Sequence, residues 1–134
     1  MKSSDNTKAD KDLVPQAKSS VVVYEGGNGV NLEVKYDGET VWLTQAQMAV
    51  LFGRSISVIS RHVNCVFSEG ELPKEGNLHF LQITYKPMAY YSLDVVISVG
   101  YRVKSFEGIS FRQWATRKLR GYGAEMERQK RKGE

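Results

Sequence analysis

The chain contains little of what disulfide-stabilised or membrane-spanning proteins require. Cys65 is the only cysteine, so no disulfide can form within the chain. No apolar run approaches the roughly 20 residues that a transmembrane helix needs. The first residues, MKSSDNTKADKD, lack the apolar segment of a secretory signal peptide. These absences lead us to expect a cytoplasmic protein with no membrane partner.

Residue sets that would support catalysis or metal binding are also missing. His62 and Cys65 are three positions apart and can share a helix face, but two ligands do not make a zinc site, and His79 is far from both. The stretch GGNG at residues 26–29 lacks the following helix and lysine of a phosphate loop. No paired carboxylates or Ser–His–Asp set stand out. We therefore expect no enzymatic activity, no metal site and no cofactor.

Acidic residues are scarce toward one end of the chain, so its charge is unevenly distributed. Residues 1–101 contain nine Lys/Arg and eleven Asp/Glu, a net charge of −2. Residues 102–134 contain ten Lys/Arg and four Glu, a net charge of +6. A basic end on a nearly neutral body is typical of proteins that bind polyanions such as nucleic acids. A solvated basic tail without a partner would have the same composition.

The succession of patterns predicts an α+β fold with a small antiparallel sheet. Runs rich in β-branched and aromatic residues, separated by glycine-containing turns, occupy residues 21–24, 31–36 and 40–43. Residues 78–91 alternate and are interrupted near Pro87, which predicts a two-stranded hairpin. Residues 1–20 are polar and lack periodicity, so we expect a disordered leader there.

Apolar residues at helical spacing, together with capping residues, predict four helices. The expected helices cover residues 45–52, 56–68, 93–103 and a segment from Ser110 that ends at Gly121 and Gly123. Two pairs, Thr44 with Gln47 and Ser110 with Gln113, have the spacing of a capping box. The apolar stripes include Ile56 and Tyr101. The globular domain is expected at residues 21–122, followed by a flexible basic tail at 123–134.

Residues 44–68 combine the features of a helix-turn-helix. Ala49 provides a small side chain where the second helix crosses the first, and Gly53 provides a residue that tolerates positive φ in the turn. Ile59 belongs to the stripe that the second helix would bury. The hairpin at 78–91 follows in the position of a wing. The sequence thus predicts a winged-helix-like helix-turn-helix domain with a small antiparallel sheet and C-terminal helices.

The polar face of the second helix carries side chains that suit DNA. Arg61 can bond a guanine edge or a phosphate, Asn64 can bond adenine, and short serines allow close approach to a duplex. No acidic residue occurs between Thr40 and Val63, which suits a surface that meets phosphates. The predicted main surface consists of Arg54, Ser55, Ser57, Ser60, Arg61 and Asn64. The predicted phosphate contacts are Lys86, Arg112, Arg117, Lys118 and Arg120.

Four stretches of the chain closely resemble the RhuM family, bacterial proteins found on pathogenicity islands and in mobile elements. They are ETVWLTQAQMAVLF, ISRHV, SLDVVISVGYRVKS and FRQWATRKLR. The segment LDVVISVGYRVKS with FRQW is also similar to the second half of the Bro-N domain of phage antirepressors. The resemblance implies a fold and a mobile-element context, and it implies no reaction.

These observations predict a DNA-binding protein, transcriptional-regulatory and of mobile-element or pathogenicity-island origin, whose partner is double-stranded DNA. The alternative is an antirepressor-like module without sequence-specific DNA binding, which docks on a repressor protein or on itself as a homodimer. Salt separates the two, because binding through several phosphate contacts weakens steeply as salt rises, whereas docking through apolar surface does not.

Overall fold

The computed structural model describes residues 20–27, 29–82 and 85–132, with side chains described as far as residue 119. The leader expected at residues 1–20 lies outside the described residues except for Ser20, which begins the first strand. The domain limits expected at residues 20 and 122 stay predictions.

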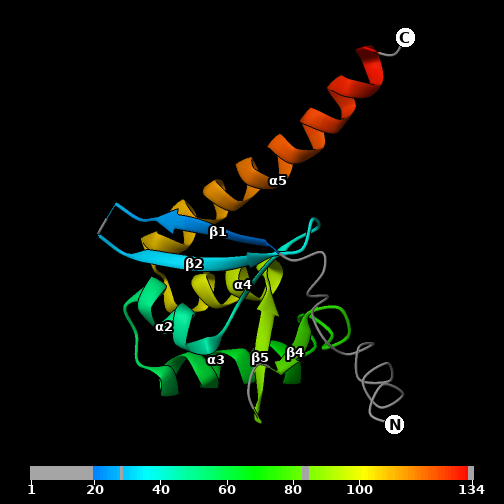
Figure 1. Ribbon diagram of the computed structural model, residues 1–134. Coiled ribbons are helices and arrows are strands. Elements are labelled where there is room, and N and C mark those ends of the chain that lie inside the picture. Colours follow the sequence, from blue (N-terminus) through cyan, green and yellow to red (C-terminus); the bar gives the residue numbers. More distant parts are fainter. Residues whose placement is uncertain (1–19, 28, 83–84, 133–134) are drawn as a thin grey trace, which may run out of the picture.

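A five-stranded antiparallel sheet is formed in the order β1-β2-β3-β5-β4. Its strands are β1 (Ser20–Glu25), β2 (Asn31–Tyr36), β3 (Val41–Leu43), β4 (Leu78–Gln82) and β5 (Pro87–Ser92). The short strand β3 joins two hairpins, because Trp42 lies opposite Lys35 of β2 and opposite Ser92 of β5. Figure 1 shows the sheet strongly twisted, with β1 and β2 running across the view and β5 nearly upright. The α+β class expected from the sequence is confirmed.

Four helices are present in the described part of the chain. They are α2 (Gln45–Phe52), α3 (Ile56–Ser68), α4 (Leu93–Val103) and α5 (Phe106–Lys132). The bounds of the first three match the prediction. The capping box of α2 is also confirmed, since the Thr44 hydroxyl accepts from the Gln47 amide at 3.1 Å and the Gln47 side chain accepts from the Thr44 amide at 3.0 Å.

The turn between α2 and α3 depends on Gly53, which has φ 66° and ψ 40° in the left-handed region. This confirms the positive φ predicted for it. A residue without Cβ adopts this conformation at little cost. The amide of Arg54 then donates to the Ala49 carbonyl at 3.0 Å, which closes the last turn of α2. The two helices of the predicted helix-turn-helix are thereby held by a three-residue connection, Gly53 to Ser55.

The start predicted for the fourth helix is wrong. Helix α5 begins at Phe106 and not after Ser110. The Ser105 side chain accepts a hydrogen bond from the Glu107 amide at 3.2 Å, and the Ser105 carbonyl accepts one from Gly108 at 3.1 Å. A serine before the first turn is sufficient for capping. Ser110, which has the same chemistry, lies inside the helix.

The predicted end of this helix is also wrong, because α5 passes through Gly121 and Gly123 and continues to Lys132. Each glycine costs a helix only about 1 kcal/mol relative to alanine. The residues that follow, AEMERQKRK, are strong helix formers, and their sequence places opposite charges four positions apart. The local preference of this segment therefore outweighs the two glycines. The mobility expected for residues 123–134 stays a prediction.

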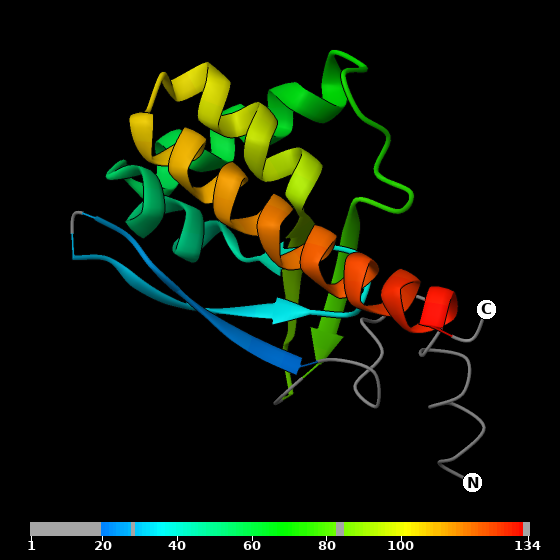
Figure 2. The same cartoon turned by 90° about the horizontal axis from the view of Figure 1, so that it is seen from above.

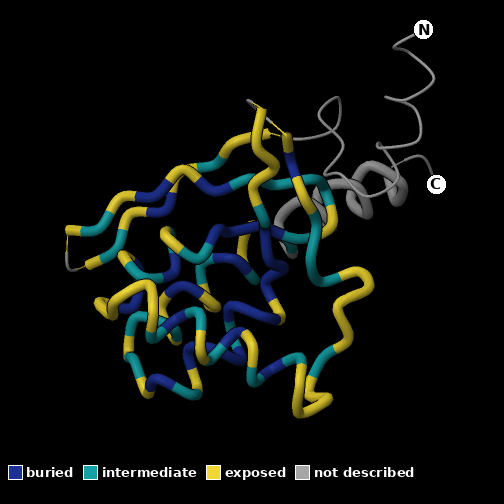
Figure 3. The backbone as a smooth tube through the Cα atoms, turned by 90° about the horizontal axis from the view of Figure 1, so that it is seen from below, coloured by how far each residue is buried: buried dark blue, intermediate teal, exposed yellow. Residues whose placement is uncertain are grey.

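One face of the sheet packs on the helices. Leu32 and Val34 of β2 are buried, whereas Glu33 between them is exposed. Figure 3 shows the buried segments gathered in the interior. The stripe prediction for α3 is confirmed for Ile59, and Val63 and Val66 on the same side of the helix are also nearly inaccessible. It is wrong for Ile56, which is 54% exposed because the first turn of α3 extends beyond the elements that cover the rest.

Helix α5 is anchored to the rest of the molecule by aromatic side chains. The ring of Tyr24 on β1 lies edge-on to Phe111 and Trp114, with centroid distances of 5.1 and 5.2 Å. On the other side, α4 and α5 approach closely at Gly100 and Gly108. A Cβ atom at either glycine would lie 3.3 Å from the ring of Phe52, so the two glycines admit that ring between the helices. Figure 2 shows α4 and the first half of α5 side by side.

Among the helices that the structure describes, none combines the length and apolar character required to cross a lipid bilayer.

Candidate nucleic-acid interface

Helix α3 presents one polar stripe to the solvent. Ser57, Arg61 and Asn64 are exposed at intervals of three and four residues, and Ser60 between them is partly buried. The opposite stripe of α3 is buried in the core. In addition, Phe67 stacks on Tyr91 of β5 at a centroid distance of 6.3 Å. Packing on one side therefore orients the predicted DNA-binding residues of α3 outward, as sequence periodicity predicted.

The N-terminus of α3 is capped by Ser55. Its hydroxyl accepts from the Val58 amide at 3.3 Å and is 3.1 Å from the hydroxyl of Ser57. The first turn of α3 contains no acidic residue. Free backbone N–H groups and the positive end of the helix dipole therefore face solvent beside exposed hydroxyls, which is an environment that favours phosphate.

Arg54 has a structural role that the sequence did not reveal. Its guanidinium donates to the carbonyls of Phe52 and Gly53 at 3.0 and 3.3 Å, and to the carbonyl of Val103 at 2.8 Å. These are carbonyls at the C-terminal ends of α2 and α4, which lack helical partners. Arg54 thus joins two helix ends, and fewer of its five N–H groups remain for DNA.

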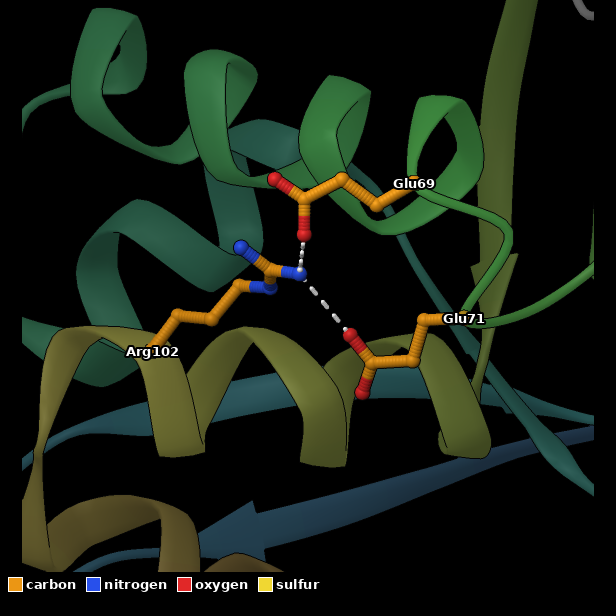
Figure 4. A network of polar contacts seen from close by, with 3 residues as sticks. All are labelled: Glu69, Glu71 and Arg102. Atoms are coloured by element: carbon orange, nitrogen blue, oxygen red, sulfur yellow. Dashed lines mark hydrogen bonds and ion pairs between the residues drawn. The ribbon is translucent and has the colours of Figure 1, made fainter.

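The C-terminal end of α3 is acidic. Glu69 and Glu71 follow the helix, and both accept from Nη2 of Arg102 on α4, at 2.6 and 3.0 Å (Figure 4). Hydrogen bonds from Ser98 and then from Arg102 lower the pKa of the Glu71 carboxyl, so it stays ionised at neutral pH. Two carboxylates with one guanidinium leave a net negative charge there. Only the N-terminal part of α3 therefore suits a polyanion.

His62 lies next to Arg61 and is partly buried. Burial lowers the pKa of its imidazole below the ordinary 6.5, and the positive charges of Arg61 and Arg102 lower it further. The ring is thus mainly neutral at pH 7. Arg61 is the only Lys or Arg in the sequence of α3.

The hairpin of β4 and β5 follows α3, as predicted. Lys86 is exposed just before β5, next to residues 83–84, which lie outside the described range. Figure 1 shows the free end of this hairpin and helix α3 on the same, lower side of the molecule. The free end of the hairpin and α3 are therefore both accessible from that side.

The predicted phosphate contacts on α5 lie elsewhere. Arg112, Arg117 and Lys118 are exposed, and the side chain of Arg120 lies outside the described residues. Helix α4 packs against both α3 and α5, and α5 leads away from α3 toward the top of Figure 1. The structure brings together the α3 residues and Arg54, but it does not place the α5 cations beside them.

No group of three or more His, Cys, Asp or Glu side chains that could hold a metal ion occurs within residues 20–27, 29–82 and 85–119. Cys65 is partly buried, and its thiol is free.

A comparison with known families finds a match in the second half of the chain. The model of the Virulence protein RhuM family matches residues 74–131, which include β4, β5, α4 and almost all of α5. We refer to residues 74–131, which are similar to this family, as the RhuM segment. This confirms the resemblance carried by SLDVVISVGYRVKS and FRQWATRKLR, whereas the two stretches within residues 39–63 precede the matched RhuM segment. No curated protein and no solved structure matches the chain.

Sequence reasoning missed one further feature of the RhuM segment. Tyr101 and Phe106 expose 76% and 85% of their surface, and Ile109 exposes 49%. Helical periodicity had placed Tyr101 on the buried stripe of α4, which is wrong because α5 packs on α4 at Gly100 and leaves the Tyr101 side chain exposed. The sequence did contain a signal for this exposure. The stretch YRVKSFEGI has more apolar residues than a corner between two helices can bury.

Proposed function

We propose that this protein binds double-stranded DNA through the N-terminal part of α3, in a winged-helix-like arrangement, and that it acts by binding and not by catalysis. The observation that carries this proposal is the exposed stripe of Ser57, Arg61 and Asn64 on a helix whose other side is buried. These side chains can bond base edges or phosphates. A transcriptional-regulatory role fits a sequence-reading surface of this kind.

The connectivity around α3 supports this arrangement. The order β3, α2, α3, β4, β5, with the strands paired as β3-β5-β4, provides two helices joined by a short turn and a hairpin directly after the second helix. In a helix-turn-helix protein the second helix enters the major groove with its N-terminal residues against the bases. The acidic end at Glu69 and Glu71 favours the same orientation, because it would lie away from the groove.

The RhuM segment supports the proposed context. The chain resembles a family whose members occur in mobile elements and on pathogenicity islands, which suits a regulator that such elements encode. In this proposal Lys86 provides an additional phosphate contact beside α3, and the exposed cations of α5 provide a second, separate one.

The test is selection of bound sequences from random duplexes, followed by Arg61→Ala. We expect the variant to lose about 1–3 kcal/mol of binding free energy on the selected duplex and to discriminate less against scrambled duplexes, as a bidentate base contact predicts. Lys35→Ala is the matched control, because it removes the same charge from β2 of the sheet. It should change binding little at moderate salt.

Two outcomes contradict the proposal. One is a selection that enriches no sequence and shows no binding at low salt. The other is an Arg61→Ala protein, folded by circular dichroism, that binds like the parent.

A further inference from the structure

We propose a second binding surface on the RhuM segment: a groove between the end of α4 and the start of α5 that receives an acidic amphipathic helix of a partner protein. The groove has a volume of about 440 Å³. The residues that the argument uses are Ile97, Tyr101, Lys104, Phe106, Ile109 and Arg112. This proposal does not depend on DNA binding by α3.

The groove is apolar where a partner side chain would enter it. Its floor contains Gly100 and Gly108, which lack side chains, and the partly buried Ile97. Its walls include Tyr101, Phe106 and Ile109, all largely exposed. Exposed apolar residues clustered in this way mark interaction sites in soluble proteins. An amphipathic helix that inserts apolar residues at intervals of three and four is the partner that such a groove between helices receives.

The charge at the rim determines the chemistry of the partner. Lys104 and Arg112 both line the groove, and no acidic residue does. Neither cation forms a salt bridge within the part of the chain that the structure describes. The nearby Glu107 does not line the groove. Burial, and then the charge of Glu107, raise the pKa of the Tyr24 hydroxyl, so this carboxylate acts on Tyr24 of β1. A partner helix with acidic residues flanking its apolar face would complement these two cations.

A second copy of the chain and a small ligand fit less well. Two copies joined groove to groove would bring Lys104 and Arg112 of one near those of the other, and like charges oppose association. A small ligand is normally buried over most of its surface. Walls that expose 76% and 85% of Tyr101 and Phe106 leave the groove too open for that.

The experiment is a selection with the full chain as bait. The library displays random amphipathic helices of about four turns, or roughly 15 residues. Enriched peptides are then synthesised with a fluorescent label, and binding is measured by anisotropy. We expect enriched sequences to combine an apolar face with flanking Asp or Glu. Tyr101→Ala and Phe106→Ala should each weaken their binding about tenfold or more, because both remove apolar surface from the groove wall.

A charge-matched pair of variants separates the groove from general attraction to a basic protein. Lys104→Glu with Arg112→Glu should abolish binding of the acidic peptides. Arg117→Glu with Lys118→Glu changes the net charge of the chain equally but alters α5 outside the groove. It should weaken binding only slightly at moderate salt. Because Tyr101 and Phe106 are so exposed, the alanine variants should fold, which circular dichroism checks.

The proposal is overturned if no peptide is enriched, if enriched peptides lack acidic residues, or if Tyr101→Ala binds them like the parent. It is also overturned if the two charge variants weaken binding equally. Two further results would assign the groove to another occupant: self-association that Tyr101→Ala abolishes, or tight binding of a single-stranded oligothymidylate that Tyr101→Ala and Phe106→Ala weaken by loss of stacking.

Discussion

Gly53 illustrates how a single backbone conformation supports the candidate interface. Its φ of 66° places it in the left-handed region, and no atom beyond its two chain neighbours lies within 4 Å of the position that a Cβ would occupy. A side chain at this position would therefore meet backbone strain and no steric clash with its surroundings. Because glycine adopts this conformation without strain, the turn can hold α3 in its orientation relative to α2.

We expect Gly53→Val to destabilise the protein by about 1–3 kcal/mol, because a β-branched residue is strained at positive φ. Chemical denaturation measures the change in the free energy of unfolding. Gly27→Val is the matched control, since Gly27 also has free space around it but does not have positive φ. A Gly53→Val protein as stable as the parent would show that the turn can be built in another way.

The pKa of His62 responds to the charge near Arg61. In the folded protein, burial and the neighbouring cations hold its pKa below 6.5. The unfolded chain therefore binds a proton more readily than the folded one, so stability decreases as pH falls below 6.5 toward the folded-state pKa. A phosphate near Arg61 would offset the positive charge and raise the pKa of His62 again.

We therefore expect the pKa of His62, followed by NMR, to rise when the selected duplex binds. By linkage, affinity should increase as pH is lowered from about 7.5 toward 6. His62→Gln should remove this part of the pH dependence while leaving affinity at high pH similar. If the duplex binds and the pKa of His62 stays unchanged, the phosphates do not approach this part of α3.

Helix α5 shows how an element can extend beyond the domain core that holds it. Its first part is anchored by Phe111 and Ala115, both fully buried, and by the contacts of Trp114 with Tyr24. Its C-terminal part carries Arg128, Lys130, Arg131 and Lys132 in a sequence with few apolar residues. Such a segment contributes charge more than packing.

Deletion of residues 124–134 should leave the melting temperature nearly unchanged. It should weaken binding to preferred and scrambled duplexes by similar factors, because non-specific phosphate contacts carry no sequence information. The slope of log K against log salt should become shallower by up to about 0.9 for each phosphate that this segment neutralises in the parent complex. Weaker binding to the preferred duplex alone would mean that this segment reads sequence.

At the scale of the whole molecule, the basic residues of α3 and α5 proposed to contact DNA fall on two separate surfaces. Arg61 lies on α3, whereas Arg117 and Lys118 lie on α5, and α4 packs against both helices. The two surfaces share no hydrogen bond or salt bridge among the described side chains. Their contributions to DNA binding should therefore be independent.

We expect the decreases in binding free energy from Arg61→Ala and from Arg117→Ala with Lys118→Ala to add within about 0.5 kcal/mol in the combined variant. The effect of the α5 pair should also require a long duplex, since a short one cannot reach both surfaces. Binding isotherms with short and long duplexes measure both effects. Strong non-additivity on a short duplex would indicate that the two surfaces act as one.

Most of the secondary structure could be predicted because its causes are local. Thr44 and Ser55 bond amides three residues away, and Gly53 adopts positive φ without help from distant residues. The first three helices and the strands therefore lie where the sequence predicted them. The weakest local prediction was α5, where two competing serines and two glycines made the ends ambiguous.

By contrast, only the tertiary structure decided which side chains are buried and which hydrogen-bond partners they have. Ile56 and Tyr101 have the periodicity of core residues but are exposed. No other element covers the first turn of α3, and α5 packs on α4 at Gly100 and leaves the Tyr101 side chain uncovered. Arg54 has a side chain that suits DNA contact, but its guanidinium donates to the carbonyl of Val103, 49 positions away. The sequence determined which side chains of α3 share a face. Only the packing of α4 between α3 and α5 separated that face from the α5 cations, because contacts between distant segments follow from how the elements fill the core.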